Sequence, residues 1–102
     1  MEAKLPIALK VNDLDNVATL FSNEGKAGAQ IEIRDKKGES SLITLKNDIP
    51  YGHKIALCPI EKGSDIVKYG ESLGEASANI VPGEHVHVHN LDSKRGRGDW
   101  EV

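Results

Sequence analysis

Apolar and polar residues alternate along several short segments of the chain. The alternating apolar positions near its start are Leu5, Ile7, Leu9 and Val11. Ile31 and Ile33 repeat the pattern, and the polar segment 35–39 joins them to a second apolar run at 42–45. Side chains at i and i+2 of a strand share a face, so this period predicts strands with one buried face and a β-hairpin around residues 35–39.

Three later segments extend the strand pattern. The apolar run 53–60, the β-branched segment 65–69 and the strictly alternating segment 84–89 each predict a strand. Residues 71–80 have near-helical apolar spacing interrupted by a glycine, which allows at most a short helical turn. Residues 13–21 suit either a helix or a strand, and both alternatives stay open. The whole pattern predicts a compact all-β domain.

Length and charge narrow the function classes. The chain has 102 residues, 38% of them hydrophobic, and a formal net charge of −3, which predicts one folded domain without affinity for nucleic acid or anionic membranes. It has neither a membrane-spanning apolar run nor a signal peptide, so a cytoplasmic location is expected. The domain is expected to cover residues 1–92, followed by a flexible basic tail at 93–102. The single Cys58 is predicted to be a buried, inert thiol in a strand.

The segment 83–90 carries the strongest chemical signal. In a continuous strand His85, His87 and His89 would line one face, while Val86 and Val88 would face the core. Three imidazoles on one face form a metal-ligand arrangement, since neutral histidine is the commonest metal ligand in proteins. The alternative is that these histidines hydrogen-bond to water or to neighbouring backbone groups, and the sequence leaves both interpretations open.

Other polar residues are less specific. His53 follows Gly52 at the entry to a predicted strand, where it serves a site or is simply solvated in a turn. Lys68 is a candidate for binding an anion, and Tyr69, pointing the other way, is predicted to lie in the core or an interface. The sequence has no glycine-rich phosphate loop, no cysteine pair for zinc and no serine-centred nucleophile elbow.

Five segments occur in a fixed order that resembles a known family. They are Asp-Asn-Val-Ala at 15–18, Gly-His-Lys-Ile-Ala-Leu at 52–57, Ile-Glu-Lys-Gly at 60–63, Val-Lys-Tyr-Gly at 67–70 and Ile-Val-Pro-Gly-Glu-His-Val-His-Val-His-Asn at 80–90. Together they resemble the SAF domain at the N-terminus of altronate and galactarate dehydratases, the UxaA family of sugar-acid hydro-lyases. The resemblance covers about residues 9–98 and implies a β-clip, a small barrel-like all-β fold.

The resemblance also implies a function. Long members of the family continue into a large catalytic part, whereas segment 95–99 resembles the tail of short members, which are small subunits paired with a large dehydratase subunit. Sulfolactate sulfo-lyase has a similar division into a small SAF-type subunit and a large one, and both families are associated with iron. The chain is therefore expected to be the small subunit of a lyase complex, inactive by itself, that acts on a hydroxy acid with Fe²⁺ or another divalent metal.

The resemblance suggests roles for individual residues. The predicted catalytic residues are His53, His87 and His89. The predicted metal ligands are His85, His87 and His89. The predicted substrate-binding residues are Lys54, Lys68 and Asn90. Two other hypotheses stay open: a non-catalytic carbohydrate- or ligand-binding module, because SAF-like domains also occur in sialic acid synthases and resemble type III antifreeze proteins, and a stand-alone metal-binding protein. Self-association of the chain without its partner is a further expectation.

Overall fold

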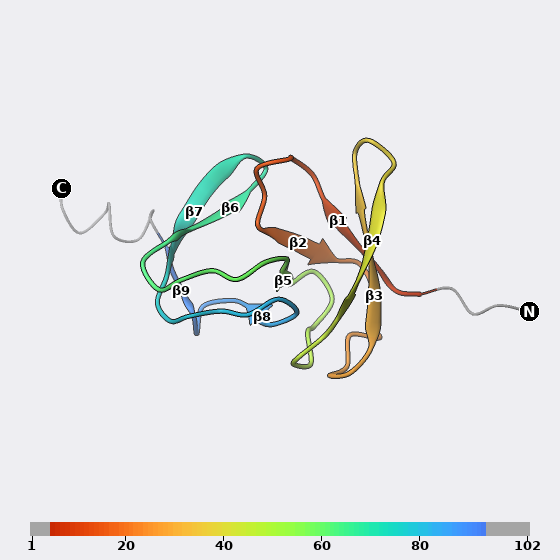
Figure 1. Ribbon diagram of the computed structural model, residues 1–102. Coiled ribbons are helices and arrows are strands. Elements are labelled where there is room, and N and C mark those ends of the chain that lie inside the picture. The colour runs from red at the N-terminus through yellow and green to blue at the C-terminus, as the bar shows by residue number, and fades with distance from the viewer. Residues whose placement is uncertain (1–4, 94–102) are drawn as a thin grey trace, which may run out of the picture.

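The computed structural model describes residues 5–93, which form nine β-strands (Figure 1). The strands are β1 (Ile7–Lys10), β2 (Val17–Leu20), β3 (Gln30–Asp35), β4 (Ser40–Thr44), β5 (Lys54–Ala56), β6 (Asp65–Lys68), β7 (Glu71–Ala76), β8 (His85–Val86) and β9 (Leu91–Ser93). Residues 5–93 contain no helix long and apolar enough to cross a membrane. The predicted all-β fold is confirmed, while the cytoplasmic location stays a prediction.

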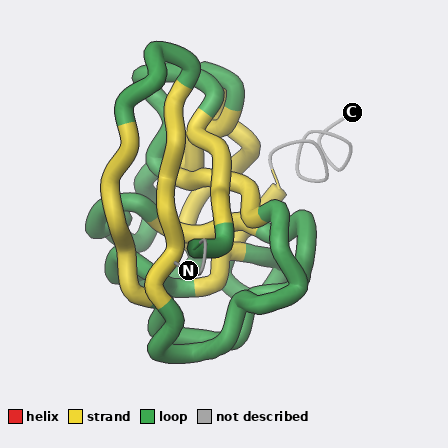
Figure 2. Tube along the Cα trace, turned by 90° about the vertical axis from the view of Figure 1, so that its right-hand side faces the viewer, coloured by secondary structure: helices red, strands yellow, loops and turns green. Residues whose placement is uncertain are grey.

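The strands form two sheets. The larger has six strands in the order β4-β3-β1-β2-β5-β8, in which only β1 and β3 are parallel among the described pairs. The smaller sheet is antiparallel, with three strands in the order β6-β7-β9. Figure 2 shows the strands packed together in the middle of the molecule, with loops at both ends. The predicted tail at 93–102 lies outside the described residues except for Ser93, which ends β9.

One face of the larger sheet packs on a first core. This core consists of Ala8, Ala18, Leu20, Ile31, Ile33, Leu45, Ile49 and Ile55. The prediction that Leu5 and Leu9 lie on the buried face of the first strand is wrong, because they are 37% and 40% exposed while Ala8 is fully buried. Ala8 lies between Leu20 on β2 and Ile33 on β3, whose larger side chains fill that side of the sheet.

The second core lies between the two sheets. It consists of Val17, Ala56, Ile60, Ile66, Ala76, Ile80 and Val86. All of β2 is buried, because its alternate residues face different cores: Ala18 and Leu20 the first, Val17 the second. The segment 13–21, which suited either a helix or a strand, therefore contains a strand that separates the two cores.

Two sequence predictions in this part of the molecule are wrong. Residues 71–76 form strand β7 rather than a helical turn, because their backbone pairs with β6 on one side and β9 on the other. Strand β5 ends at Ala56, where the next residue, Leu57, donates its N–H to the carbonyl of Asn16 (2.9 Å). Cys58 follows this point and is exposed rather than buried in a strand.

Asp15 and Asn16 connect the two sheets. The buried carboxylate of Asp15 accepts the N–H groups of residues 11 and 12 at 3.2 and 3.0 Å through one oxygen, and that of Gly70 at 2.8 Å through the other. The Asn16 side chain accepts the N–H of Val67 (2.8 Å) and donates to a carbonyl of the same strand (2.9 Å). These bonds hold the β6–β7 hairpin against the loop between β1 and β2.

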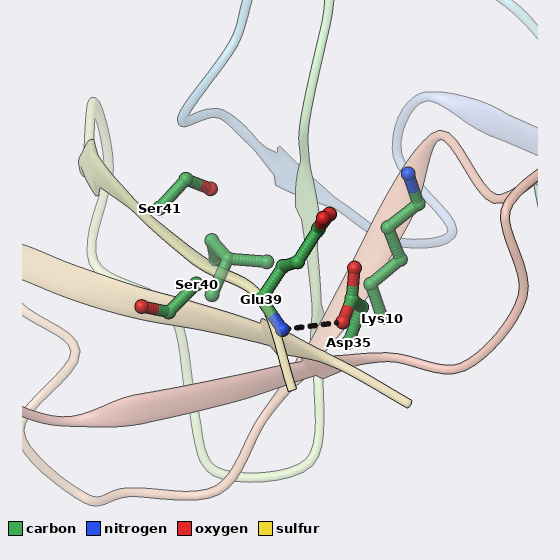
Figure 3. A pocket seen from close by; sticks show the side chains of 6 residues that line it. Lys10, Asp35, Glu39, Ser40 and Ser41 are labelled. Carbon is green, nitrogen blue, oxygen red and sulfur yellow. Dashed lines mark hydrogen bonds between the residues drawn. The ribbon is translucent and has the colours of Figure 1, made fainter. Parts of the chain in front are cut away.

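The β3–β4 hairpin has a small open hollow at its turn. The hollow, about 200 Å³ in volume, is lined by Lys10, Ile33, Asp35, Glu39, Ser40 and Ser41 (Figure 3). The Asp35 carboxylate turns toward the backbone and accepts the N–H groups of Lys37 and Glu39, each at 2.9 Å. The polar groups here close the turn, and the histidines lie elsewhere in the fold.

Candidate metal centre

Pairing of β5 with β8 brings three histidines together. In this antiparallel pair Ile55 lies opposite His85, and His53 precedes Ile55 by two residues on the same face. The ring centroids of His53 and His87 are 4.1 Å apart, those of His53 and His85 are 5.0 Å apart, and those of His85 and His87 are 5.6 Å apart. The three rings are nearly parallel, with interplanar angles of 25° or less.

These three residues, hereafter the histidine cluster, have the donor set of a metal site. Each is half-buried and offers one ring nitrogen, and the three nitrogens lie within 4.8 Å of one another. Nδ1 of His53 and Nε2 of His85 share a hydrogen bond of 2.8 Å. Nδ1 of His87 is buried and has no hydrogen-bond partner among the described residues. Imidazole nitrogens suit divalent zinc, iron, copper and nickel, so the cluster fits one such ion.

The electrostatic environment lowers the pKa of two members of the cluster, His85 and His87. Burial, followed by the positive charges of the neighbouring histidines and of Lys54, lowers the pKa of His85 from 6.5 to about 4. Burial also lowers the pKa of His87, with further contributions from His53 and Lys54. Neutral imidazole is the form that binds metal, so both side chains are prepared for ligation at neutral pH.

The predicted continuous strand over 84–89 is wrong after Val86. The backbone turns at His87, whose carbonyl accepts the N–H of Asn90 (3.0 Å). The Asn90 side chain holds this turn by accepting the N–H of His87 (3.0 Å) and donating to the carbonyl of His85 (2.9 Å). Val88, predicted to face the core, is 79% exposed as a result, whereas Val86 is fully buried as predicted.

The turn leaves His89 outside the group of three close ring nitrogens, although its ring still lies beside that of His85. His89 is exposed, and its ring lies 5.2 Å from that of His85 at an angle of 45°. His53, predicted as catalytic rather than as a ligand, occupies the third place in the cluster instead. Asn90 is only 6% exposed and its amide is bonded to the backbone, so its predicted contact with substrate, like ligation by His89, stays a prediction.

Of the two predicted substrate-binding lysines, Lys54 directly follows His53 of the cluster, and its charge acts on His85 and His87. Burial lowers the pKa of Lys54, and the positive charge of Lys68 lowers it further. Lys68 ends β6, with its Nζ 5.0 Å from the ring centroid of Tyr69. Tyr69 is 58% exposed at the hairpin tip, with a positive φ of 57°. The core alternative for Tyr69 is therefore wrong, and the interface alternative stays a prediction.

Comparison with known proteins decides the family. Residues 6–94 match the family described as the altronate/galactarate dehydratase SAF domain. The chain belongs to this SAF domain family. The resemblance inferred from the five sequence segments is thereby confirmed.

Relatives of this SAF domain include dehydratases and sulfo-lyase subunits. The chain is 38% identical over 100 residues to altronate dehydratase of Escherichia coli (strain K12), and the match covers 91% of this chain and 19% of that protein. It is 41% identical over 93 residues to the (2R)-sulfolactate sulfo-lyase subunit alpha of Chromohalobacter salexigens, covering 89% of this chain and 99% of that subunit. The chain thus spans about a fifth of the dehydratase and nearly the whole sulfo-lyase subunit.

Two residues of the SAF domain were given no role by the sequence interpretation. Asp15 and Asn16 do not touch the histidine cluster through any described hydrogen bond, but they fix β6 and thereby the backbone position of Lys68. An Asp-Asn pair directly before a strand is a signal for side chain to backbone hydrogen bonding. Its partners, 49 to 55 residues away, follow only from the folded chain.

Proposed function

We propose that this SAF domain is the small subunit of a lyase complex and completes the active site of a separate large subunit. The reaction class is removal of a group β to the carboxylate of a hydroxy acid, as in an altronate- or galactarate-type dehydratase. The observation that carries the proposal is the half-buried histidine cluster, in a domain whose relatives include both kinds of lyase.

Sulfolactate sulfo-lyase is the second candidate. It is favoured by the extent of the match, because the chain corresponds to 99% of one sulfo-lyase alpha subunit but to 19% of an altronate dehydratase. In both candidates the leaving group departs from the carbon next to the one that loses its proton. The distinction concerns the leaving group, which is water in one reaction and sulfite in the other.

We further propose that the histidine cluster holds Fe²⁺ in the assembled complex. His53, His85 and His87 would be the ligands, which accounts for the unpartnered Nδ1 of His87. When bound, a divalent ion of this kind polarises the oxygen atoms of a hydroxy acid and stabilises negative charge.

His89 and the lysines have separate roles in this proposal. Elimination requires a base that accepts the proton next to the carboxylate and an acid that donates a proton to the leaving group. His89 is exposed at the rim of the cluster, where its imidazole can hold or donate a proton. Lys54 and Lys68 supply positive charge for the carboxylate. The remaining catalytic groups belong to the large subunit.

Metal binding by the full chain tests the cluster. We expect one Fe²⁺ per chain in anaerobic calorimetry, and an affinity at least about 100-fold lower when His53, His85 or His87 is replaced by alanine. His89→Ala is the matched control and should change the affinity by less than about threefold, because the three clustered nitrogens remain. Equal losses in His89→Ala and His87→Ala would show that the ligand set is different.

Reconstitution tests the lyase function. Copurification of the tagged chain from its native host should recover a large subunit, and the mixture should eliminate water from altronate or galactarate, or sulfite from sulfolactate. Activity should require both proteins and a bound metal. A large subunit that is equally active without this chain would contradict the proposal, and so would recovery of the chain alone and without activity.

A further inference from the structure

Strand β4 forms an edge of the larger sheet. Among the described strands it pairs with β3 alone, through five residue pairs in an unbroken register. Beyond the end of β4, the N–H of Leu45 donates to the carbonyl of Ala29 (2.9 Å), so the odd-numbered residues form the hydrogen-bonded pairs of this antiparallel ladder. The N–H and carbonyl groups of Ser40, Leu42 and Thr44 therefore point away from β3, toward the outside of the sheet.

The edges at β6 and β8 are satisfied by side chains, unlike the edge at β4. The Asn16 side chain bonds to the backbone of β6 at 2.8 and 2.9 Å. On β8 the side chains of Asn47 and Asn90 bond to the N–H and to the carbonyl of His85, each at 2.9 Å. Within residues 5–93 no such bond reaches the outward backbone groups of residues 40 and 42. Strand β4 thus keeps the hydrogen-bonding capacity of a strand that lacks a neighbour.

Strand β4 also lacks the features that keep edge strands apart. Natural edge strands are commonly protected by charged side chains, proline or a bulge. The five residues of β4 are Ser-Ser-Leu-Ile-Thr, without charge or proline, and their ladder with β3 has no bulge. Leu42, in the middle of the strand, is 57% exposed. A strand of another chain can therefore extend the sheet at β4.

A groove beside this edge fits a second β4 strand. Its volume is about 390 Å³, and it lies between β4 and the residues Leu57 and Pro82, with Ile33 in its wall. Ser41 and Ile43, which alternate with the outward residues, line the groove on the β4 side. In an antiparallel pair of two β4 strands centred on Leu42, Ser41 lies opposite Ile43 of the second copy. The small serine leaves room for that isoleucine beside the apolar wall.

We propose that β4 pairs antiparallel with β4 of a second copy of this chain, which gives a twofold-symmetric dimer with one continuous sheet. In this register Leu42 lies opposite Leu42 of the second copy and Ser40 lies opposite its Thr44, so side chains of like polarity meet. Glu39 precedes β4 and Lys46 lies just beyond it, so the antiparallel arrangement brings the acidic end of one strand to the basic end of the other. The dimer depends neither on the metal nor on the lyase reaction.

Sedimentation equilibrium of the metal-free full chain, from micromolar to millimolar concentration, tests the dimer. We expect a monomer–dimer equilibrium, with concentration-dependent nitrogen-15 NMR shifts at the amides of Ser40, Leu42 and Thr44. Leu42→Lys should raise the dimer dissociation constant by at least about 100-fold, because it places two like charges at the twofold axis. Leu14→Lys is the matched control: Leu14 is 71% exposed outside β4, and this variant should dimerise as the wild type does.

Disulfide formation tests the register. The native Cys58 is exposed, so the experiment uses a Cys58→Ser background. Leu42→Cys should link two copies on oxidation, because the Cα atoms of a hydrogen-bonded antiparallel pair lie about 5.5 Å apart, a separation that a disulfide spans. Leu14→Cys in the same background is the control and should stay monomeric.

Three outcomes would overturn the dimer. They are a chain that remains monomeric at every concentration, crosslinking of Leu14→Cys as efficient as that of Leu42→Cys, and a Leu42→Lys variant that dimerises like the wild type. Shifts at the amides of residues 40, 42 and 44 that arise only on addition of a copurified large subunit would also overturn it, and would assign the β4 edge to a strand of that subunit.

Discussion

The β3–β4 hairpin and the β5–β8 pair are built from the same alternation but have different roles. Five residue pairs hold β3 against β4, whereas two pairs hold β5 against β8. An aspartate or asparagine side chain organises the turn in each case: Asp35 within the hairpin and Asn90 after β8. The long pair carries a regular sheet edge, and the short pair carries the histidine cluster.

The difference shows how a short strand creates a site. In β3, Ile31 and Ile33 face the core while Glu32 and Arg34 form an ion pair on the other side, as strict alternation requires. Along β8 the side chain of Asn90 competes for the backbone groups that would otherwise continue the ladder. The chain turns at His87, whose ring stacks against that of His53 instead of extending a row.

Gly83→Ala should have the largest effect, because Gly83 connects these two regions. Its carbonyl accepts the N–H of Lys46 (2.9 Å) and its N–H donates to Ala56 (2.8 Å). It has a φ of 91°, and an added Cβ would collide with the carbonyl oxygen of Thr44. We expect the free energy of unfolding in urea to fall by about 3 kcal/mol or more.

Gly38→Ala in the β3–β4 turn is the matched control for Gly83→Ala. Its φ is nearly the same, 88°, but an added Cβ would meet no atom within 4 Å. The expected loss is about 1 kcal/mol, which reflects the backbone conformation alone. Equal losses at Gly83 and Gly38 would show that the contact between the two regions contributes nothing.

Asn90→Ala should have the next largest effect. It should show that the turn after β8, unlike the turn of the β3–β4 hairpin, supports the histidine cluster. It leaves the partly buried N–H of His87 and carbonyl of His85 without these partners, and we expect a loss of about 1–3 kcal/mol in unfolding free energy. Metal affinity should fall as well, because the turn that places His87 is released. Asp35→Ala in the other turn should cost less than about 1 kcal/mol, since its bonds are exposed, and should leave metal affinity unchanged. A loss of metal affinity in Asp35→Ala would contradict the view that only the turn after β8 supports the metal site.

The pH dependence of stability should reveal the histidines of the β5–β8 region. Because the pKa of His85 in the folded chain is about 4 and its ordinary value is 6.5, the unfolded chain binds protons more readily between these values. The free energy of unfolding should therefore be constant above about pH 7 and fall as the pH drops from about 6.5 to 4. The lowered pKa of His87 acts in the same direction.

Melting curves of the metal-free chain between pH 7 and pH 4 measure this dependence. His85→Asn should flatten it, because the titrating group is removed while a polar side chain of similar reach is kept. A slope in His85→Asn as steep as that of the wild type would assign the pH dependence to other groups.

Local pattern determined much of the fold. Alternation and turn composition predicted the hairpin of β3 and β4, strand β6 and the all-β class, and the five segments in fixed order pointed to the family. Alternation did not tell which of the two faces of β1 is covered, because that depends on Leu20 and Ile33 across the neighbouring strands. Nor did it predict β7, whose hydrogen bonds come from strands on both sides.

The sequence by itself determined that three histidines lie near one another at 85–89. In the structure two of them, His85 and His87, form a cluster with His53. Only the tertiary structure decided that His53 joins the cluster, since it lies 32 residues before His85 and meets it through the β5–β8 pair. Tertiary structure also placed Thr19 of β2 opposite Lys54 of β5. The physical reason is that spacing along a chain sets the face a side chain takes, whereas its neighbours across strands are set by hydrogen-bond register and by the packing of one sheet on another.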